Sequence, residues 1–213
     1  MPKKDYLVID IETMPDLSKV NMLPEPSVDS RLKDPAKIEE ALQTARQKQI
    51  EKMALNAETG IIACIGYGNI TNSVVSVHDE KQMIKFFFKE ALPKTLVTFN
   101  GINFDLPFIY KRAMILGVEA PYSIERYIKR YSTTFHVDLM QIWSGWSSQG
   151  FVSLDYLSSL ILGKKKVDFD FKQIPELLKS EQGKEKLKEY CLKDVELTTE
   201  LFNKMKGYLF NDW

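Results

Sequence analysis

The chain has 213 residues, of which 44% are hydrophobic and 11% aromatic, enough to form the core of one large domain. Lysine plus arginine equal aspartate plus glutamate at 29 each, so no net positive field attracts polyphosphate, and a nucleic-acid site must be a local patch. No stretch reaches the roughly 18 apolar residues of a membrane span. We therefore expect one soluble domain over residues 1–213, neither exported nor bound to a membrane.

The number and spacing of the cysteines indicate the cellular compartment. Cys64 and Cys191 have neither the number nor the spacing of a disulfide framework or a zinc site, so we expect two buried free thiols. A reducing cytoplasm follows from this interpretation.

The first predicted element is an apolar run at 6–11 whose two faces are both hydrophobic, which is typical of an internal strand. Prolines and few apolar residues follow, and Pro35 then begins a charged segment with helical spacing. Residues 13–60 are therefore predicted to be an insertion, a loop followed by a mostly exposed helix over 36–56.

Strands are predicted at 61–68 and 73–78, joined as a hairpin, and again at 95–99. Apolar residues recur at helical intervals in four segments, 80–92, 104–116, 154–162 and 184–207. The run VDFDF at 167–171 favours a short extended piece. This order predicts an α/β fold, a sheet with helices packed on it.

Asp10 and Glu12 are two residues apart on the first strand, so their side chains share one face about 6.6 Å apart along it. Acids at a strand end are often merely solvated. On an internal strand, however, an unpaired carboxylate costs several kcal/mol, and a cation would remove that cost.

Two further acids fall where a site can form. Tyr190 and Asp194 are four residues apart on one helical face, although an edge tyrosine beside a surface acid has the same spacing. Asp105 starts a helix beyond a strand end, where α/β proteins place their sites, and it could equally be a helix cap. Separated acids without a Cys or His cluster predict hard cations, two Mg²⁺ or Mn²⁺, and no cationic side chain is expected among them.

Three segments resemble the three motifs of the DEDD 3′-to-5′ exonucleases: DIE at 10–12, FNGINFD at 99–105 and YCLKD at 190–194. Tyr190 matches the Tyr subclass, because the His subclass would need histidine where this chain has Glu189. FNGINFDLPFI, HVDLM and VSLDYLSSLILGKK also resemble the proofreading domain of family B DNA polymerases, in that order.

The resemblance implies a ribonuclease H-like mixed sheet flanked by helices. It implies that Asp10, Glu12 and Asp194 bind metal directly, that Asp105 holds the second ion largely through water, and that Tyr190 orients the attacking water. Asn100 and Phe104 match positions that touch the terminal nucleotides, and they could equally be a turn residue and a core ring. Because no polymerase module is present, we expect no proofreading in cis.

Several basic segments are candidates for binding a strand. The run 126–131 interleaves cations with aromatic side chains, although a solvated amphipathic helix has the same pattern. The lysines at 164–166 lie near the end of a predicted helix, where cations could instead complement the helix dipole. In the insertion, four basic residues would flank the mouth of the site, Lys37, Arg46, Lys48 and Lys52. His78 and His136 are interpreted as structural, and Asp138 and Asp155 as rival acids in structural segments.

The sequence thus predicts a two-metal exonuclease that releases nucleoside monophosphates from the 3′ end of single-stranded nucleic acid, DNA in preference to RNA. The alternatives are an exoribonuclease of the same mechanism, a catalytically inactive nucleic-acid-binding module and a metal-binding regulatory domain. The sequence identifies no polymerase or repair partner.

Overall fold

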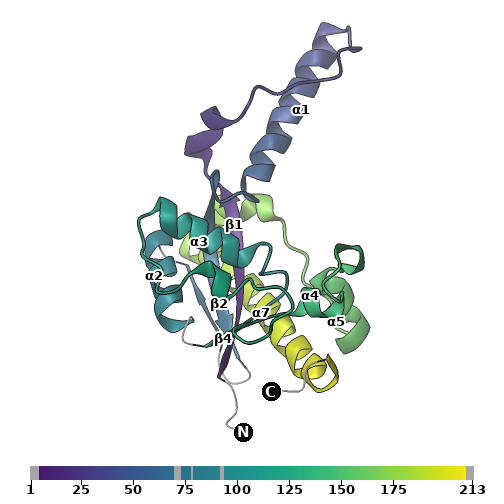
Figure 1. Cartoon of the computed structure of the whole chain (residues 1–213). Helices are drawn as coiled ribbons and strands as arrows, with labels where there is room; N and C mark the ends of the chain where they lie inside the picture. The colour runs from purple at the N-terminus through teal and green to yellow at the C-terminus, as the bar shows by residue number, and fades with distance from the viewer. Residues whose placement is uncertain (1–4, 70–72, 78, 92–93, 210–213) are drawn as a thin grey trace.

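A computed structural model describes residues 5–69, 73–77, 79–91 and 94–209 of the chain. Its centre is a five-stranded mixed sheet in the order β3-β2-β1-β4-β5 (Figure 1). The strands are β1 (Tyr6–Pro15), β2 (Gly60–Gly68), β3 (Ser73–Ser76), β4 (Thr95–Thr98) and β5 (His136–Asp138). The helices are α1 (Pro35–Met53), α2 (Glu80–Glu90), α3 (Asp105–Ile115), α4 (Leu139–Trp143), α5 (Leu154–Leu162), α6 (Ile174–Leu177) and α7 (Glu181–Leu209).

The predicted α/β order is confirmed. β1 is antiparallel to β2 and parallel to β4, β4 is parallel to β5, and β2 and β3 form the expected hairpin. The predicted end of the second hairpin strand, His78, lies outside the described residues. None of the helices in the described ranges combines the length and apolarity that crossing a bilayer requires.

β1 is an internal strand, as predicted. Its successive side chains point to opposite faces of the sheet, and each face has its own hydrophobic core. Leu7, Ile9 and Ile11 pack with residues of α2 and α3 on one face, whereas Val8 packs with residues of α5 and α7 on the other. Because side chains alternate along a strand, the acids at positions 10 and 12 share the face of Val8 and point toward α7.

The predicted insertion begins later than position 13. β1 continues to Pro15, which pairs with Gly60, and a register shift between Glu12 and Thr13 allows the strand to extend. The strand is longer than its apolar run because backbone pairing with β2 stabilises the polar end. The excursion therefore comprises residues 16–59.

Within this excursion the predicted helix is present as α1. Asp34 caps it by accepting a hydrogen bond from the amide of Ala36, and Pro35 fits the first turn, where no amide donor is needed. Only Met53, at the end next to the sheet, is buried. α1 and the segment before it form an arm that extends away from the sheet (Figure 1).

The piece predicted to be extended at 167–171 pairs with no strand. Its backbone is extended at Asp170, and a short 3-10 helix, η4 (Phe171–Gln173), begins at the next residue. Phe169 and Phe171 pack against the ring of Tyr190 on α7, with ring centroids 4.2 and 5.7 Å away. Aromatic packing on a helix therefore fixes this segment, and not strand pairing.

A buried ion pair joins three elements at the root of the arm. The guanidinium of Arg112 on α3 donates two hydrogen bonds, of 2.8 and 2.6 Å, to the carboxylate of Glu80 on α2. Arg112 also donates to the carbonyl of Ala57, and Glu80 accepts from the amide of Ile62 on β2. Every charged atom of this pair is held by a partner, as burial requires.

Replacing Arg112 with alanine should lower the free energy of unfolding by about 3–5 kcal/mol, because Glu80 would be left buried without its counter-charge. Urea unfolding measures this loss. The control is Lys111→Ala, which removes an exposed ion pair to Glu58 and should cost less than about 1 kcal/mol. Equal small losses in the two variants would contradict this role for Arg112.

Candidate active site

Asp10 and Glu12 lie together in the middle of β1, facing α7. One ligand atom from each carboxylate and the thiol sulfur of Cys191 lie within 4.8 Å of one another. Glu12 is only 6% exposed, and Asp10 is partly buried. The predicted pair therefore shares one site, but a thiol accompanies it.

α7 brings Tyr190 and Asp194 to the same place. Asp194 is 1% exposed, so it lies inside the core and not at its border. The Tyr190 hydroxyl approaches the Asp194 carboxylate; burial raises the pKa of Tyr190, and the negative charge of Asp194 raises it further. The tyrosine ring is fixed by Phe169, which stacks on it.

Lys166 corrects the expectation that no cationic side chain lies among the acids. Its Nζ is 2.6 Å from Oδ2 of Asp194, and its charge opposes the rise that burial causes in the pKa values of Asp10 and Glu12. Asp155 positions this lysine, because its carboxylate accepts a hydrogen bond of 2.7 Å from the Lys166 amide. The lysine cluster was visible in the sequence, but its proximity to Asp194 requires the tertiary fold.

Asp105 reaches the site from the first turn of α3. Its Oδ1 accepts a hydrogen bond of 3.1 Å from the amide of Ile11, the residue between Asp10 and Glu12. Burial raises the pKa of Asp105 to about 7, and the charge of Asp138 adds to the shift. Asp105 is thus buried against the backbone of β1 and is not simply a helix cap.

The pKa values of the other three acids are raised as well. Burial raises the pKa of Asp10 well above its ordinary value, and the negative charges of Asp105 and Asp194 raise it further. Burial likewise raises the pKa of Glu12, with Asp10 as the next contribution. Burial also raises the pKa of Asp194, although Lys166 opposes that shift. One lysine does not offset the cost of burying four carboxylates.

The motif segment after β4 is held by a residue that the sequence analysis set aside. The carboxylate of Asp138 accepts hydrogen bonds from the amides of Asn100 and Ile102, and from two amides at the start of α4. Asn100 has a left-handed backbone with φ 70°, which asparagine tolerates better than most residues. Phe104 is partly exposed just before α3.

The donor set fits hard divalent cations. Among the described residues, Oδ1 of Asp194 is buried without a hydrogen-bond partner, which leaves an oxygen available to a ligand. Carboxylate oxygens are the ligands that Mg²⁺ and Mn²⁺ prefer. Cys191 adds a soft donor, but a hydrogen bond with the Cys64 thiol, together with burial, raises the pKa of the Cys191 thiol. Both cysteines are free and buried, as predicted.

Other residues considered in the sequence have structural contacts. His136 is buried between the hydroxyl of Thr98 and the carbonyl of Tyr127. The predicted strand-binding run 126–131 is not an exposed helix, since Tyr127 is buried and Arg126 stacks on the ring of Phe135 at 3.8 Å.

Comparison with known proteins connects this arrangement to polymerases. The chain is 30% identical over 141 residues to a DNA polymerase of Thermococcus litoralis, covering 59% of this chain and 8% of that protein. It is 31% identical over 150 residues to DNA polymerase 1 of Aeropyrum pernix, covering 64% of this chain and 15% of that protein. The chain thus spans less than a fifth of these relatives.

A comparison with solved structures also finds a polymerase. The structure of the family B DNA polymerase from the hyperthermophilic archaeon Pyrobaculum calidifontis matches with a TM-score of 0.61 at 19% identity. The match covers 96% of this chain and 25% of that one, and it supports the expected ribonuclease H-like fold.

A family model described as a predicted 3′-5′ exonuclease related to the exonuclease domain of PolB matches residues 65–209, well over half of the chain. The matched region includes the segments of Asn100, Asp105, Lys166 and the two α7 residues of the site. The chain therefore belongs to this family of exonucleases related to the PolB exonuclease domain.

Proposed function

We propose that this protein is a 3′-to-5′ exonuclease of the Tyr subclass that removes nucleoside monophosphates from single-stranded DNA with two divalent cations, Mg²⁺ or Mn²⁺. The whole chain, 1–213, would act as one exonuclease domain. The observation that supports this most is the cluster of Asp10 and Glu12 against Cys191 of α7, close enough to Asp194 for the charges of Asp10 and Asp194 to interact, with an unpartnered buried oxygen on Asp194.

In this proposal Asp10, Glu12 and Asp194 bind the cations, and Asp105 adds the fourth carboxylate. Two bound cations supply Lewis acidity for the attacking water and for the leaving oxygen of the phosphodiester. The hydroxyl of Tyr190 orients the water, and its ring is held in place by Phe169. Asn100 and Phe104 contact the terminal nucleotides.

The experiment that tests the function is cleavage of single-stranded DNA and RNA labelled at the 5′ end, with Mg²⁺ or Mn²⁺ and with chelator. We expect a ladder shortening from the 3′ end of DNA only when metal is present. Faster shortening of RNA than of DNA would identify RNA as the preferred substrate. The absence of product with either metal would contradict an active exonuclease.

Substitutions should separate metal ligands from the residue that orients water. Asp10→Ala and Asp194→Ala should abolish cleavage because each removes a ligand, whereas Tyr190→Phe should slow it about 10- to 100-fold. Single-turnover rates measure both effects. Glu196→Ala, an exposed acid two residues beyond Asp194, is the control and should keep the full rate. Full rate in Tyr190→Phe, or total loss in it, would contradict the assigned roles.

The electrostatics of the site should appear in thermal melts. With chelator, Asp10→Asn should melt at a higher temperature than the unsubstituted protein, because it removes one buried charge at nearly constant volume. With millimolar Mn²⁺ the order should reverse, since a ligand of the folded state stabilises by mass action and the variant binds it weakly. Differential scanning calorimetry measures both orders.

Lys166→Gln removes a positive charge from the site, whereas Asp10→Asn removes a negative one, so the two variants can be compared directly. It should melt lower with chelator, because Asp194 loses its counter-charge, and it should gain more from Mn²⁺ than the unsubstituted protein. If Mn²⁺ stabilises none of these proteins, the carboxylates do not form a cation site. If only the chelator order differs, the repulsion argument fails and the cation site stands.

A further inference from the structure

A groove passes under the root of α1 and begins at a catalytic carboxylate. A pocket of about 410 Å³ includes Glu12 and Phe104 in its lining. A second pocket of about 550 Å³ adjoins it, and the two share four lining residues, Thr13, Glu51, Ala54 and Phe171. Each volume is within the roughly 300–1,000 Å³ typical of ligand sites.

The walls of this groove are apolar and partly aromatic. Leu55, just beyond α1, is 62% exposed, and Phe171 on η4 is 48% exposed, although both line the pocket that contains Glu12. The ring of Phe171 also contacts the edge of Tyr190. Planar apolar surfaces that continue to the reacting centre suit a nucleobase, because every base has a face that stacks.

The rim of the groove carries positive charge. Lys48 and Lys52 on α1 line it and are exposed, and no ion pair to either is found in the described part of the chain. The acid beside them, Glu51, is neutralised by an ion pair of 2.8 Å to Lys172 on η4. This pair also joins α1 to η4.

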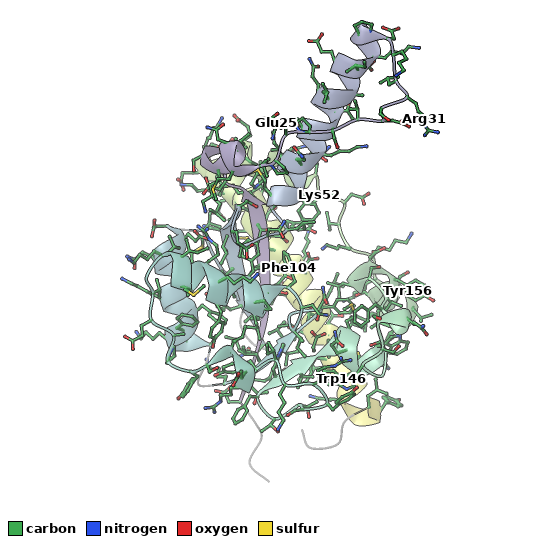
Figure 2. All side chains as sticks on the ribbon, turned by 45° about the horizontal axis from the view of Figure 1, so that its top comes forward. Glu25, Arg31, Lys52, Phe104, Trp146 and Tyr156 are labelled. Carbon is green, nitrogen blue, oxygen red and sulfur yellow. The ribbon has the colours of Figure 1, made fainter. Side chains whose placement is uncertain are left out.

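Two other basic residues of the arm, expected to guide a strand, are not placed to do so. Arg46 is held by Glu25 and by the carbonyl of Pro24. Lys37 is eleven residues before Lys48, about 16 Å along the helix axis. Figure 2 shows Arg31 at the far end of the arm and Lys52 where the arm meets the body, on the side of Phe104. The charge that can reach the groove is therefore at the root of α1.

We propose that the root of α1 is a substrate-binding wall for the last nucleotides of an unpaired 3′ strand. The terminal bases lie against Leu55 and Phe171, and their phosphates pair with Lys48 and Lys52. This inference rests on the proposed function and adds a binding surface for the strand outside the carboxylate cluster.

The test compares two double variants with the same change in charge. Lys48→Gln/Lys52→Gln should weaken binding of a fluorescent single-stranded oligothymidylate, measured by anisotropy with chelator, roughly 2- to 30-fold. It should also reduce the slope of log affinity against log salt by about 1.4, since each phosphate contact on a single strand contributes about 0.7. Lys33→Gln/Lys37→Gln, at the far end of the arm, should change neither quantity.

A second variant tests the apolar wall. Leu55→Ser should weaken binding without changing the salt slope, whereas Met114→Ser, at an even more exposed position on α3, should bind normally. Equal effects of the two lysine pairs, or unchanged binding in Lys48→Gln/Lys52→Gln, would overturn the inference. Because binding is read without metal, it stands or fails separately from cleavage: an inactive protein that shows the binding pattern would contradict only the proposed function.

Discussion

The ion pair between Lys166 and Asp194 is the contact through which the fold keeps its buried negative charge tolerable. Glu12, Asp105 and Asp194 are buried and Asp10 is partly buried near them, and loss of solvent raises the pKa of each. A carboxylate removed from water loses several kcal/mol of solvation unless a cation or hydrogen-bond donors replace it. Within the described residues a single ammonium group is in contact with these acids, and it leaves Oδ1 of Asp194 without a partner. The protein therefore supplies too little positive charge to neutralise these acids, as expected of a centre that takes cations from solution.

Three elements, β1, α7 and α3, hold these groups in place. β1 presents two acids on one face because side chains alternate, and α7 presents Tyr190 and Asp194 one turn apart. Asp105 binds the backbone between the β1 acids, which fixes α3 against the strand. Two acids outside the site position its neighbours: Asp138 holds the segment of Asn100, and Asp155 holds the backbone of Lys166. Carboxylates thus serve here both as site groups and as clamps on backbone amides.

Local patterns in the sequence were sufficient for the longer elements and for the acids on β1 and α7, since period and spacing decide which side chains share a face, but they gave neither β5 nor the short helices α4 and α6. They were insufficient wherever a distant contact decides the outcome. Lys166 was interpreted as a cation that binds a strand or complements a helix end, because nothing local to it indicates Asp194, 28 positions later in the chain. The phenylalanines of the run at 167–171 pack on Tyr190, a contact that the local pattern does not indicate. Cys191 was correctly predicted to be buried, but its place beside Asp10 and Glu12 depends on how α7 crosses β1.

The central claim is that the acids of β1 and α7 form a two-cation centre, and anomalous diffraction from crystals soaked in Mn²⁺ tests it most directly. The account predicts two peaks about 4 Å apart. They should lie among Asp10, Glu12 and Asp194, with the ammonium of Lys166 displaced from Asp194. No peak at these residues, or an ammonium group that still pairs with Asp194 at full Mn²⁺ occupancy, would contradict it.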